Sequence, residues 1–375
     1  MAEAIQARSE QSSQPSTGYM HDIIVIGASA GGVEALSQVV RGLSVDLAAA
    51  VFVVLHIPPE PASHLPEILS RQGPLPASHA QDHERIEQGH IYIAQPDRHL
   101  LLDGHHVLVS RGPKENRFRP AVDPLFRSAA FAYGPRVVGV VLTGALDDGT
   151  AGLWEIKHQG GVAVVQDPRE AAMAGMPKSA LEYVEVDHCL TLDEIGPLLG
   201  RLAHEAAPVP EPAASTDRQH ELTAYLASMM SRETRSASNM DVVATQNTQR
   251  GGTLAGYVCP ECNGPLWEMR EGKLVRFRCR VGHAFSRETM LVSQNEALDE
   301  ALWTAYETLS ESVLLAERFA AESHARGQHE VADHLEERAR LQRQRAEHMR
   351  DIIDDAAREA PLDDSAVSPS RSPTE

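Results

Sequence analysis

The strongest constraint on the fold is an alternation of short, fully apolar segments with helix-forming segments between residues 21 and 205. The apolar segments are rich in β-branched residues and lie at 23–26, 51–55, 90–94, 136–142 and 161–166. Helix-like stretches lie between them, at 31–40, 65–69, 124–132, 150–158 and 177–183. Short strands that are apolar on both faces are typical of a parallel sheet with helices packed on each side. The sequence therefore predicts one α/β domain over residues 21–205, a doubly wound, mostly parallel sheet with helices on both faces. A hairpin at 100–110, turning at Asp103-Gly104, is expected to form an antiparallel edge of this sheet.

The rest of the chain divides into smaller parts. Residues 206–257 begin with three prolines and become rich in Ser, Thr, Asn and Gln, which predicts a linker with a short helix around 222–230. Residues 258–287 form a compact Cys/His segment, which is expected to fold as a small zinc-ribbon-like module. Residues 288–360 are rich in Ala, Glu, Arg and Leu and contain no proline, which predicts a helical hairpin broken at Gly327. We expect residues 1–20 and 361–375 to be disordered.

The charge balance argues against one class of function. The chain has 34 Lys and Arg against 53 Asp and Glu, a formal net charge of −19. Because binding to a phosphate backbone needs cationic surfaces, we do not expect nucleic-acid binding. Residues 1–20 are polar and lack the apolar core of a signal peptide, and no apolar stretch has the length of a membrane span. We expect a cytoplasmic protein without membrane insertion.

A turn of small residues, Gly27-Ala28-Ser29-Ala30-Gly31-Gly32, joins the first strand to the first helix. Such a turn either brings the backbone close to a phosphate or projects a serine nucleophile. A dinucleotide site would need glycine at Ser29 and an acidic residue at the end of the second strand, where the sequence has His56. An imidazole there is suited to deprotonate a serine, and Asp147 and Asp148 follow a further apolar strand. Since parallel strands end at one edge of the sheet, the pattern predicts a Ser-His-Asp triad, although each feature alone is common in structural turns.

The region 21–200 resembles the catalytic domain of the bacterial chemotaxis protein-glutamate methylesterases, the CheB family. Five motifs carry the resemblance, in order along the chain: Ile26-Gly27-Ala28-Ser29-Ala30-Gly31-Gly32, His56-Ile57-Pro58, Arg119-Pro120-Ala121-Val122-Asp123-Pro124-Leu125-Phe126, Thr143-Gly144-Ala145-Leu146-Asp147-Asp148-Gly149 and Met176-Pro177-Lys178-Ser179-Ala180. The resemblance implies a methylesterase and glutamine deamidase that acts on chemoreceptor side chains without a metal or cofactor.

The same resemblance implies the roles of individual residues. Ser29 would be the nucleophile, His56 the base and Asp148 the orienting acid, because the family's acid directly precedes the glycine. Backbone N–H groups of Ala145 and Ala30 would bind the oxyanion. Two positions depart from the family: Ala30 stands where members with a receiver domain usually have Thr, and Leu146 replaces a Gly, a change expected to reshape the loop. About twenty polar residues precede Asp22, too few for a receiver domain, so we expect no control by phosphorylation in cis.

The Cys/His segment has the spacing of a metal site. Cys259 and Cys262 are followed after sixteen residues by Cys279 and His283, so two close pairs flank a predicted β-hairpin. Three thiolates and an imidazole suit a structural Zn²⁺ with no open position for catalysis. The fourth cysteine, Cys189, lies alone near a strand, and we expect it to be a buried apolar filler. Six basic residues make the segment locally cationic, which indicates either an acidic partner or charge balance within the protein: Arg270, Lys273, Arg276, Arg278, Arg280 and Arg287.

Apolar residues recur at helical spacing in the C-terminal region, at Leu291, Leu298, Leu302, Leu309, Val313 and Ala316, with Trp303 and Tyr306 beside them. We expect this stripe to be buried against the second helix through His334, Leu335 and Leu341. Self-association or docking of a partner through these helices is the alternative.

The sequence thus favours a protein-glutamate methylesterase with a serine triad, acting on methylated chemoreceptors or related signalling proteins. The alternative is a non-catalytic signalling scaffold whose zinc module and helical tail bind partners.

Overall fold

The computed structural model describes residues 19–59, 63–209, 212–229 and 252–359. The segments predicted to be disordered lie almost entirely outside these ranges. The chain divides into two compact units, Met1–Thr289 and Met290–Glu375. None of the described helices is both long and apolar enough to cross a lipid bilayer.

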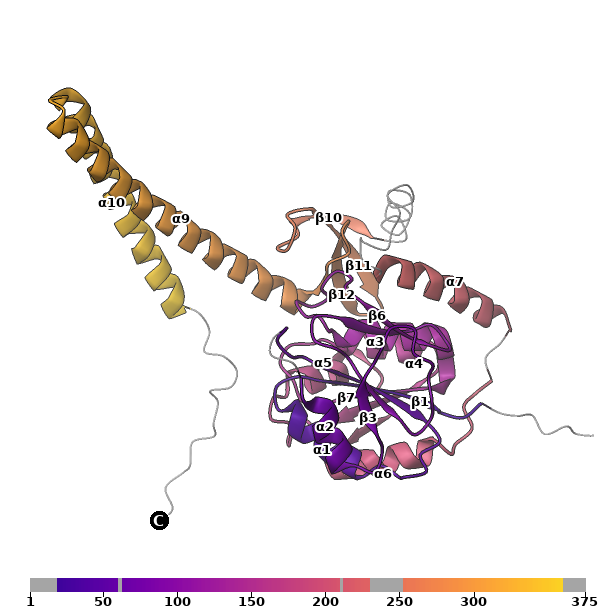
Figure 1. Cartoon of the computed structure of the whole chain (residues 1–375). Helices are drawn as coiled ribbons and strands as arrows, with labels where there is room; N and C mark the ends of the chain where they lie inside the picture. Colours follow the sequence, from indigo (N-terminus) through magenta and orange to yellow (C-terminus); the bar gives the residue numbers. More distant parts are fainter. Residues whose placement is uncertain (1–18, 60–62, 210–211, 230–251, 360–375) are drawn as a thin grey trace, which may run out of the picture. The chain divides into compact units, whose positions relative to one another are not determined.

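A seven-stranded parallel sheet forms the centre of the first unit (Figure 1). Its strands are β1 (Ile23–Ala28), β2 (Ala50–Leu55), β3 (Ala77–His79), β4 (Ile91–Ile93), β7 (Val137–Val141), β8 (Val162–Gln166) and β9 (His188–Leu190), in the spatial order β3-β4-β2-β1-β7-β8-β9. Every neighbouring pair is parallel. The central strands β1, β2 and β7 are buried along their whole length, as their apolar sequences predict.

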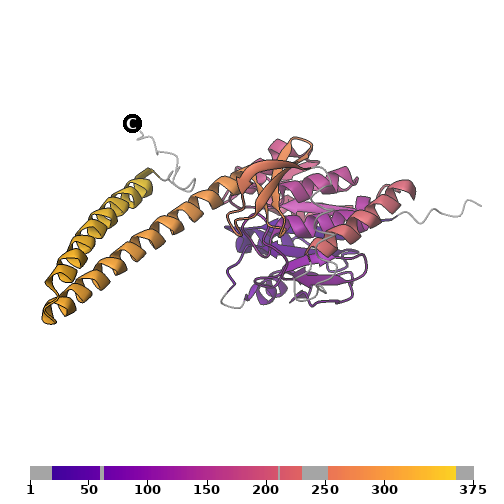
Figure 2. The same cartoon turned by 90° about the horizontal axis from the view of Figure 1, so that it is seen from above.

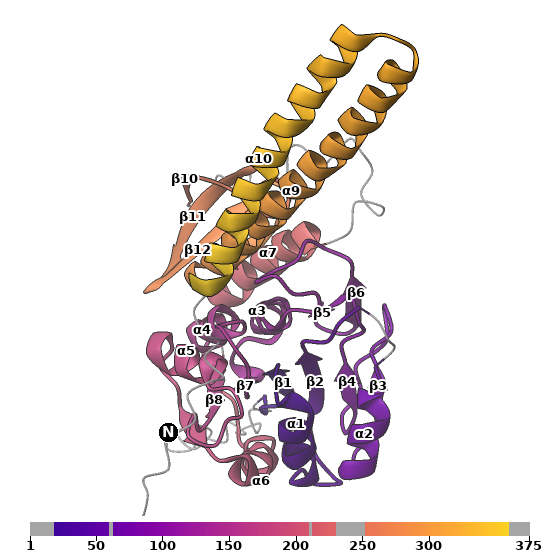
Figure 3. The same cartoon turned by 90° about the vertical axis from the view of Figure 1, so that its left-hand side faces the viewer.

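Helices cover both faces of the sheet (Figure 3). On one face lie α1 (Gly32–Arg41), α2 (Leu65–Gln72) and α6 (Leu192–Leu202), and on the other lie α3 (Val122–Tyr133), α4 (Thr150–His158) and α5 (Gly175–Tyr183). Alternate residues of β1 enter separate apolar clusters, Ile24 and Ile26 on the α1 side and Ile23 and Val25 on the α3 side. The predicted α/β architecture is confirmed.

The structure differs from the prediction for this domain in three details, two of which are corrections and one an omission. The hairpin β5 (His99–Leu102) and β6 (Val107–Ser110) forms a separate two-stranded sheet instead of an antiparallel edge. The short strands β3 and β9 and the helix α6, which contains Pro197, were not predicted. Cys189 lies in β9 as an exposed residue, not as a buried filler, because β9 is a short edge strand.

The predicted linker is partly structured. Tyr19, Met20 and the segment after α6 are joined by backbone contacts, a bridge from Met20 to Ala206 and a hydrogen bond from the Ala207 N–H to the Tyr19 carbonyl. The helix α7 (Pro212–Met229) is longer than predicted. Its Tyr225 is buried against Phe131 of α3, with ring centroids 5.9 Å apart, so that α7 packs on the α/β domain.

A four-stranded antiparallel sheet contains the Cys/His segment. Its strands are β10 (Thr253–Val258), β11 (Pro265–Glu271), β12 (Leu274–Cys279) and β13 (Ala284–Ser286), paired in this order. The sheet begins at Thr253, five residues before the predicted boundary. β11 and β12 form the hairpin predicted between the two ligand pairs, and the hairpin turns at Gly272, whose φ of 61° favours glycine. We call residues 252–286 the Cys/His module.

The second unit consists of α9 (Arg287–Ala325), apart from its first residues, and α10 (His329–Glu359). The helices lie side by side in Figure 2, joined at Gly327, which has a φ of 74°. Val313 and Ala316 of α9 pack on Ala339 of α10. The predicted stripe is only partly buried, since Leu291, Leu298 and Trp303 are 64%, 58% and 51% exposed. Leu341, the expected partner on α10, is exposed as well.

Candidate active site

Ser29 lies on the turn between β1 and α1. Its N–H donates to the Thr143 carbonyl at 2.9 Å, which ties the turn to the segment after β7. Gly31 then has a φ of 75°, and the Gly32 N–H donates back to the Ser29 carbonyl at 2.8 Å. This left-handed step lets α1 begin directly behind the serine. The side chain of Ser29 is therefore presented at the carboxyl edge of the sheet.

His56 is the first residue after β2, the strand beside β1. The His56 N–H donates to the Ala28 carbonyl at 3.1 Å, one residue before Ser29. Its ring Nδ1 lies 3.2 Å from Ser29 Oγ, and its Nε2 lies 2.7 Å from Asp148 Oδ2. Since a carboxylate only accepts, the proton of the neutral ring belongs on Nε2, and the lone pair of Nδ1 faces the serine hydroxyl.

The Asp148 carboxylate is fully buried and surrounded by donors. Oδ2 accepts from the Val122 N–H at 2.7 Å as well as from His56, and Oδ1 accepts from the Asn116 side chain and the Gly149 N–H at 2.9 and 3.0 Å. Burial would raise the pKa of Asp148, but hydrogen bonds from His56, Val122 and Asn116 outweigh it and hold the pKa below its ordinary value. Asp148 is thus held as an anion beside the imidazole.

Two residues that the sequence analysis missed support this arrangement. The ring of Phe118 stacks on His56, with centroids 3.7 Å apart and planes 10° apart. The Asn116 amide donates to Asp148 Oδ1 and also to Asp123 Oδ2, both at 2.9 Å. Asn116 and Phe118 lie within the three residues that precede the motif beginning at Arg119. Their closeness to this motif was the one sequence feature that could have identified them.

The neighbouring carboxyl groups behave differently from Asp148. Asp147 accepts from Ser286 Oγ at 2.9 Å, and burial raises its pKa well above the ordinary range. Asp123 accepts from the Gly152 N–H at 2.7 Å, yet burial and the charge of Asp148 raise its pKa to about 7 against the attraction of Arg127. The structure therefore brings Asp148 to His56 and leaves Asp147 turned toward the Cys/His module.

The loop after β7 approaches Ser29 closely at Gly144. A Cβ placed on Gly144 would lie 2.8 Å from Ser29 Cβ and 2.1 Å from Met176 Sδ. The Gly144 N–H donates to the Met173 carbonyl, whereas no acceptor is recorded in the described structure for the N–H groups of Ala30 and Ala145, whose residues are exposed. Leu146 has a φ of 60°, in the left-handed region that favours glycine.

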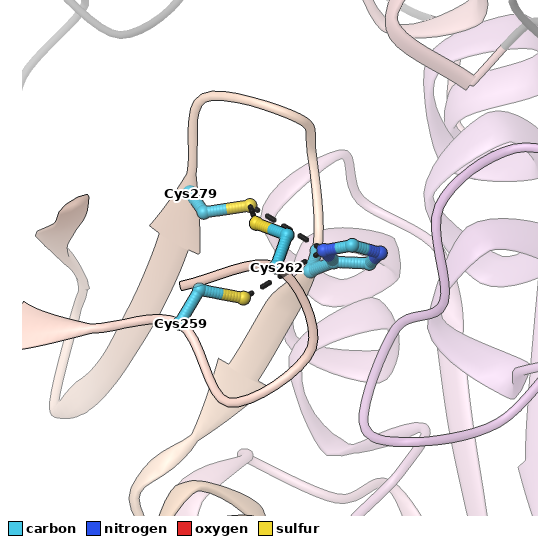
Figure 4. A group of neighbouring side chains, drawn as sticks. Cys259, Cys262 and Cys279 are labelled. Atoms are coloured by element: carbon cyan, nitrogen blue, oxygen red, sulfur yellow. Dashed lines mark hydrogen bonds between the residues drawn. The ribbon is translucent and has the colours of Figure 1, made fainter. Parts of the chain in front are cut away.

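The four predicted metal ligands converge in the Cys/His module, and the three cysteines among them are labelled in Figure 4. Cys259 Sγ and Cys279 Sγ each lie 3.6 Å from His283 Nδ1, and Cys262 Sγ lies 3.6 Å from Cys279 Sγ. All four ligand atoms lie within 4.8 Å of one another. A tetrahedral zinc with Zn–S of about 2.3 Å and Zn–N of about 2.0–2.1 Å separates its ligand atoms by roughly 3.5–3.8 Å. The donor set and its spacing fit zinc.

Comparisons with known proteins bear on the α/β domain. The family model described as CheB methylesterase matches residues 24–199. A Leptospira interrogans protein, named provisionally as a protein-glutamate methylesterase/protein-glutamine glutaminase, is 38% identical over 183 residues, which cover 48% of this chain and 95% of that protein. "Protein-glutamate methylesterase/protein-glutamine glutaminase 2" of Anaeromyxobacter dehalogenans is 39% identical over 188 residues, 50% of this chain and 55% of that protein.

Among solved structures, the crystal structure of the Thermotoga maritima CheB methylesterase catalytic domain is 34% identical, with a TM-score of 0.47, and covers 48% of this chain and 98% of that chain. The residues matched by the family model, 24–199, include Ser29, His56 and Asp148. The chain belongs to the CheB methylesterase family.

Proposed function

We propose that this chain is a protein-glutamate methylesterase that hydrolyses glutamate γ-methyl esters in a protein through Ser29, His56 and Asp148, and that it also deamidates glutamine. The observation that carries the proposal is the continuous hydrogen-bonded series from Ser29 Oγ through both ring nitrogens of His56 to Asp148. Relatives named for both activities, at 38–39% identity, support it.

The first half of the reaction forms an acyl-enzyme. His56 Nδ1 takes the hydroxyl proton of Ser29 as Oγ attacks the ester carbonyl carbon. The resulting oxyanion accepts hydrogen bonds from the N–H groups of Ala30 and Ala145, and Asp148 stabilises the imidazolium through Nε2. The tetrahedral intermediate then expels the methoxy group, which receives the proton from Nδ1 and leaves as methanol. With glutamine, the same step releases ammonia.

The second half returns the enzyme to its starting state. His56 deprotonates a water molecule, which attacks the acyl carbon, and the proton passes back to Ser29 Oγ as the glutamate side chain is released. Ser29 and His56 directly follow β1 and β2, and Asp148 lies two residues before α4, so all three catalytic side chains stand at the carboxyl edge of one sheet.

We propose methylated chemoreceptors, or a related methylated signalling protein, as the substrate. The test is methanol release from methylated chemoreceptor membranes by the intact chain and by Ser29→Ala. Release by the intact chain that disappears in the variant supports the esterase. A cellular effect that survives Ser29→Ala would instead favour the scaffold alternative, in which the domain binds a partner without turnover.

We also propose that Cys259, Cys262, Cys279 and His283 hold a structural zinc ion, because all four ligand positions are filled by protein. One zinc per chain in the purified protein, with loss of binding and a lower melting temperature in Cys262→Ser, is the expected result. A metal-free chain with an unchanged melting temperature would contradict the proposal. Cys189→Ser is the matched control, since its thiol lies outside the cluster.

A further inference from the structure

The Cys/His module contacts the α/β domain through a fully buried carboxylate, Glu115. Arg276 and Arg278, both on β12, donate to Glu115 at 3.1 and 2.7 Å. Arg127 of α3 donates to the same carboxylate at 2.9 Å. Glu115 is 0% exposed and Arg276 is 3% exposed. Two of the six basic residues of the Cys/His segment, Arg276 and Arg278, are therefore ion-paired with one buried carboxylate inside the protein.

Backbone contacts fix the same segment. The Asn116 N–H donates to the Ala284 carbonyl of β13 at 2.8 Å, and Glu115 forms a parallel bridge with Ala284. Gly282 packs so closely on Pro113 that a Cβ there would lie 2.8 Å from Pro113 Cγ. Residues 113–118, which we call the support loop, thus run along the edge of the Cys/His module.

The support loop also contacts the catalytic groups. Glu115 is followed by Asn116, which donates to Asp148, and then by Phe118, which stacks on His56. Asn116 has a φ of 48° and the next residue, Arg117, a φ of 75°. Asparagine adopts this left-handed conformation readily, whereas arginine does so rarely and needs surrounding contacts to hold it there. The hydrogen bond of the neighbouring Asn116 N–H to Ala284 is one such contact, and it comes from the module.

We infer that Arg276 and Arg278 are positioning residues of the esterase: by binding Glu115 they hold Asn116 and Phe118 against Asp148 and His56, so that the active site is complete only when the Cys/His module is docked. This inference rests on the proposed function. Arg276 adds a direct path, since its guanidinium also lies 3.5 Å from Asp123 Oδ2, which shares the Asn116 amide with Asp148. Small misplacements of catalytic groups are costly in rate, so we expect losses of about 10- to 100-fold when the module's cations are removed.

The test compares two arginines of neighbouring strands in the full-length, metal-loaded chain. Arg276→Met replaces a buried cation with a neutral side chain of similar length. Arg270→Met does the same to an exposed cation of β11, which pairs with Glu268 of its own strand. The rate at which 4-nitrophenyl acetate acylates Ser29 is measured together with the downfield proton resonance of the His56–Asp148 hydrogen bond, assigned by its loss in His56→Gln. Both readouts are independent of receptor docking.

We expect Arg276→Met to lower the acylation rate about 10- to 100-fold and to shift or broaden the downfield resonance, with Arg276→Lys recovering part of both. Arg270→Met should match the unmodified chain. If Arg276→Met does not fold, Arg278→Met, at the more exposed edge of the contact, gives the same comparison. A folded Arg276→Met or Arg278→Met with unchanged acylation and an unchanged resonance overturns the inference. Failure of the unmodified chain to be acylated at Ser29 would instead overturn the proposed function.

Discussion

Asp148→Asn tests the reasoning about the triad most directly, because every recorded partner of the Asp148 carboxylate is a donor. Oδ1 accepts from Asn116, Gly149 and the Asp123 N–H, and Oδ2 accepts from Val122 and His56. An asparagine side chain has one oxygen, which accepts, and one NH₂ group, which donates. Either the donors at the Oδ1 position or those at the Oδ2 position must therefore face the NH₂ group instead of an acceptor.

The less costly orientation places the amide oxygen at the Oδ1 position, where it satisfies three donors. The NH₂ group then faces the Val122 N–H and His56 Nε2, which were 2.7 Å from Oδ2. The Val122 N–H loses its acceptor, at a cost of about 1–3 kcal/mol for one buried donor. His56 must accept through Nε2 and carry its proton on Nδ1, where it cannot take the proton of Ser29. In a triad, such a tautomer change lowers kcat by about 10⁴-fold.

The adjacent carboxyl group provides the matched control. Burial raises the pKa of Asp147 well above its ordinary value, and its carboxylate accepts a hydrogen bond from Ser286, away from His56. Asp147→Asn keeps an oxygen to accept from Ser286 and should leave methanol release and stability close to those of the unmodified chain. Methanol release and thermal unfolding are measured for both variants at pH 7. Equal losses in Asp147→Asn and Asp148→Asn, or an active Asp148→Asn, would refute this account of the site.

Three further predictions follow from other contacts. Gly144→Ala should abolish methanol release while the chain stays folded, because the new Cβ would lie 2.8 Å from Ser29 Cβ; a variant with ordinary activity contradicts this. Phe118→Leu removes the ring stacked on His56, a contact of about 0.5–1.5 kcal/mol, and should lower kcat several-fold without a comparable rise in KM, as steady-state kinetics would show. Asp123→Asn tests the raised pKa of that acid, which is about 7 against an ordinary 3.8. The folded state of the unmodified chain binds this proton more tightly, so stability is lost as pH rises from about 4 to 7. Asp123→Asn should therefore gain stability relative to the unmodified chain over this range in urea unfolding, and parallel pH curves would contradict the assignment.

The sequence predicted the parts of the site that depend on local pattern. Ser29 and His56 each follow an apolar β-branched strand, and parallel pairing of β1 with β2 brings the two strand ends together. Asp148 was placed by its motif, and β7 pairs with β1 on the side opposite β2. These residues could be predicted because the carboxyl ends of parallel strands lie at the same edge of the sheet, which brings the residues that follow them close together.

The remaining parts depend on contacts between distant segments. Asn116 and Phe118 lie in a loop without periodicity, and their partners Asp148 and His56 are 32 and 62 positions away, so no local pattern joins them. Arg276 and Arg278 alternate with apolar residues along β12, which predicts an exposed face. Instead, both arginines of that face bind Glu115. Glu115 lies more than 160 positions earlier in the sequence, so no local pattern around Glu115 or in β12 indicates the contact. Helix α6 was missed because Pro197 is unfavourable in a helix interior, although Thr191 and Glu194 form a capping box at its start.

The convergence of three guanidinium groups on one carboxylate makes a further, quantitative prediction about how the Cys/His module is held. Glu115 contacts Arg127, Arg276 and Arg278, whereas loss of Arg276 alone leaves Glu115 with two cations. Glu115→Gln should therefore lower the free energy of unfolding by about 3–5 kcal/mol, the cost of breaking a buried ion pair. Arg276→Met should lower it by less.

The double variant discriminates this arrangement from simple loss of packing. In Glu115→Gln the three guanidinium groups repel one another around a neutral amide, and removal of Arg276 relieves part of that repulsion. The double variant should thus be less destabilised than the sum of the two single variants, by about 0.5–3 kcal/mol in urea unfolding. Arg270→Met combined with Glu115→Gln should be additive, because Arg270 pairs with Glu268 on its own strand. Additivity in both combinations would mean that Glu115 and Arg276 do not act as a pair, and that the basic residues of β12 must be explained by something other than this internal anion.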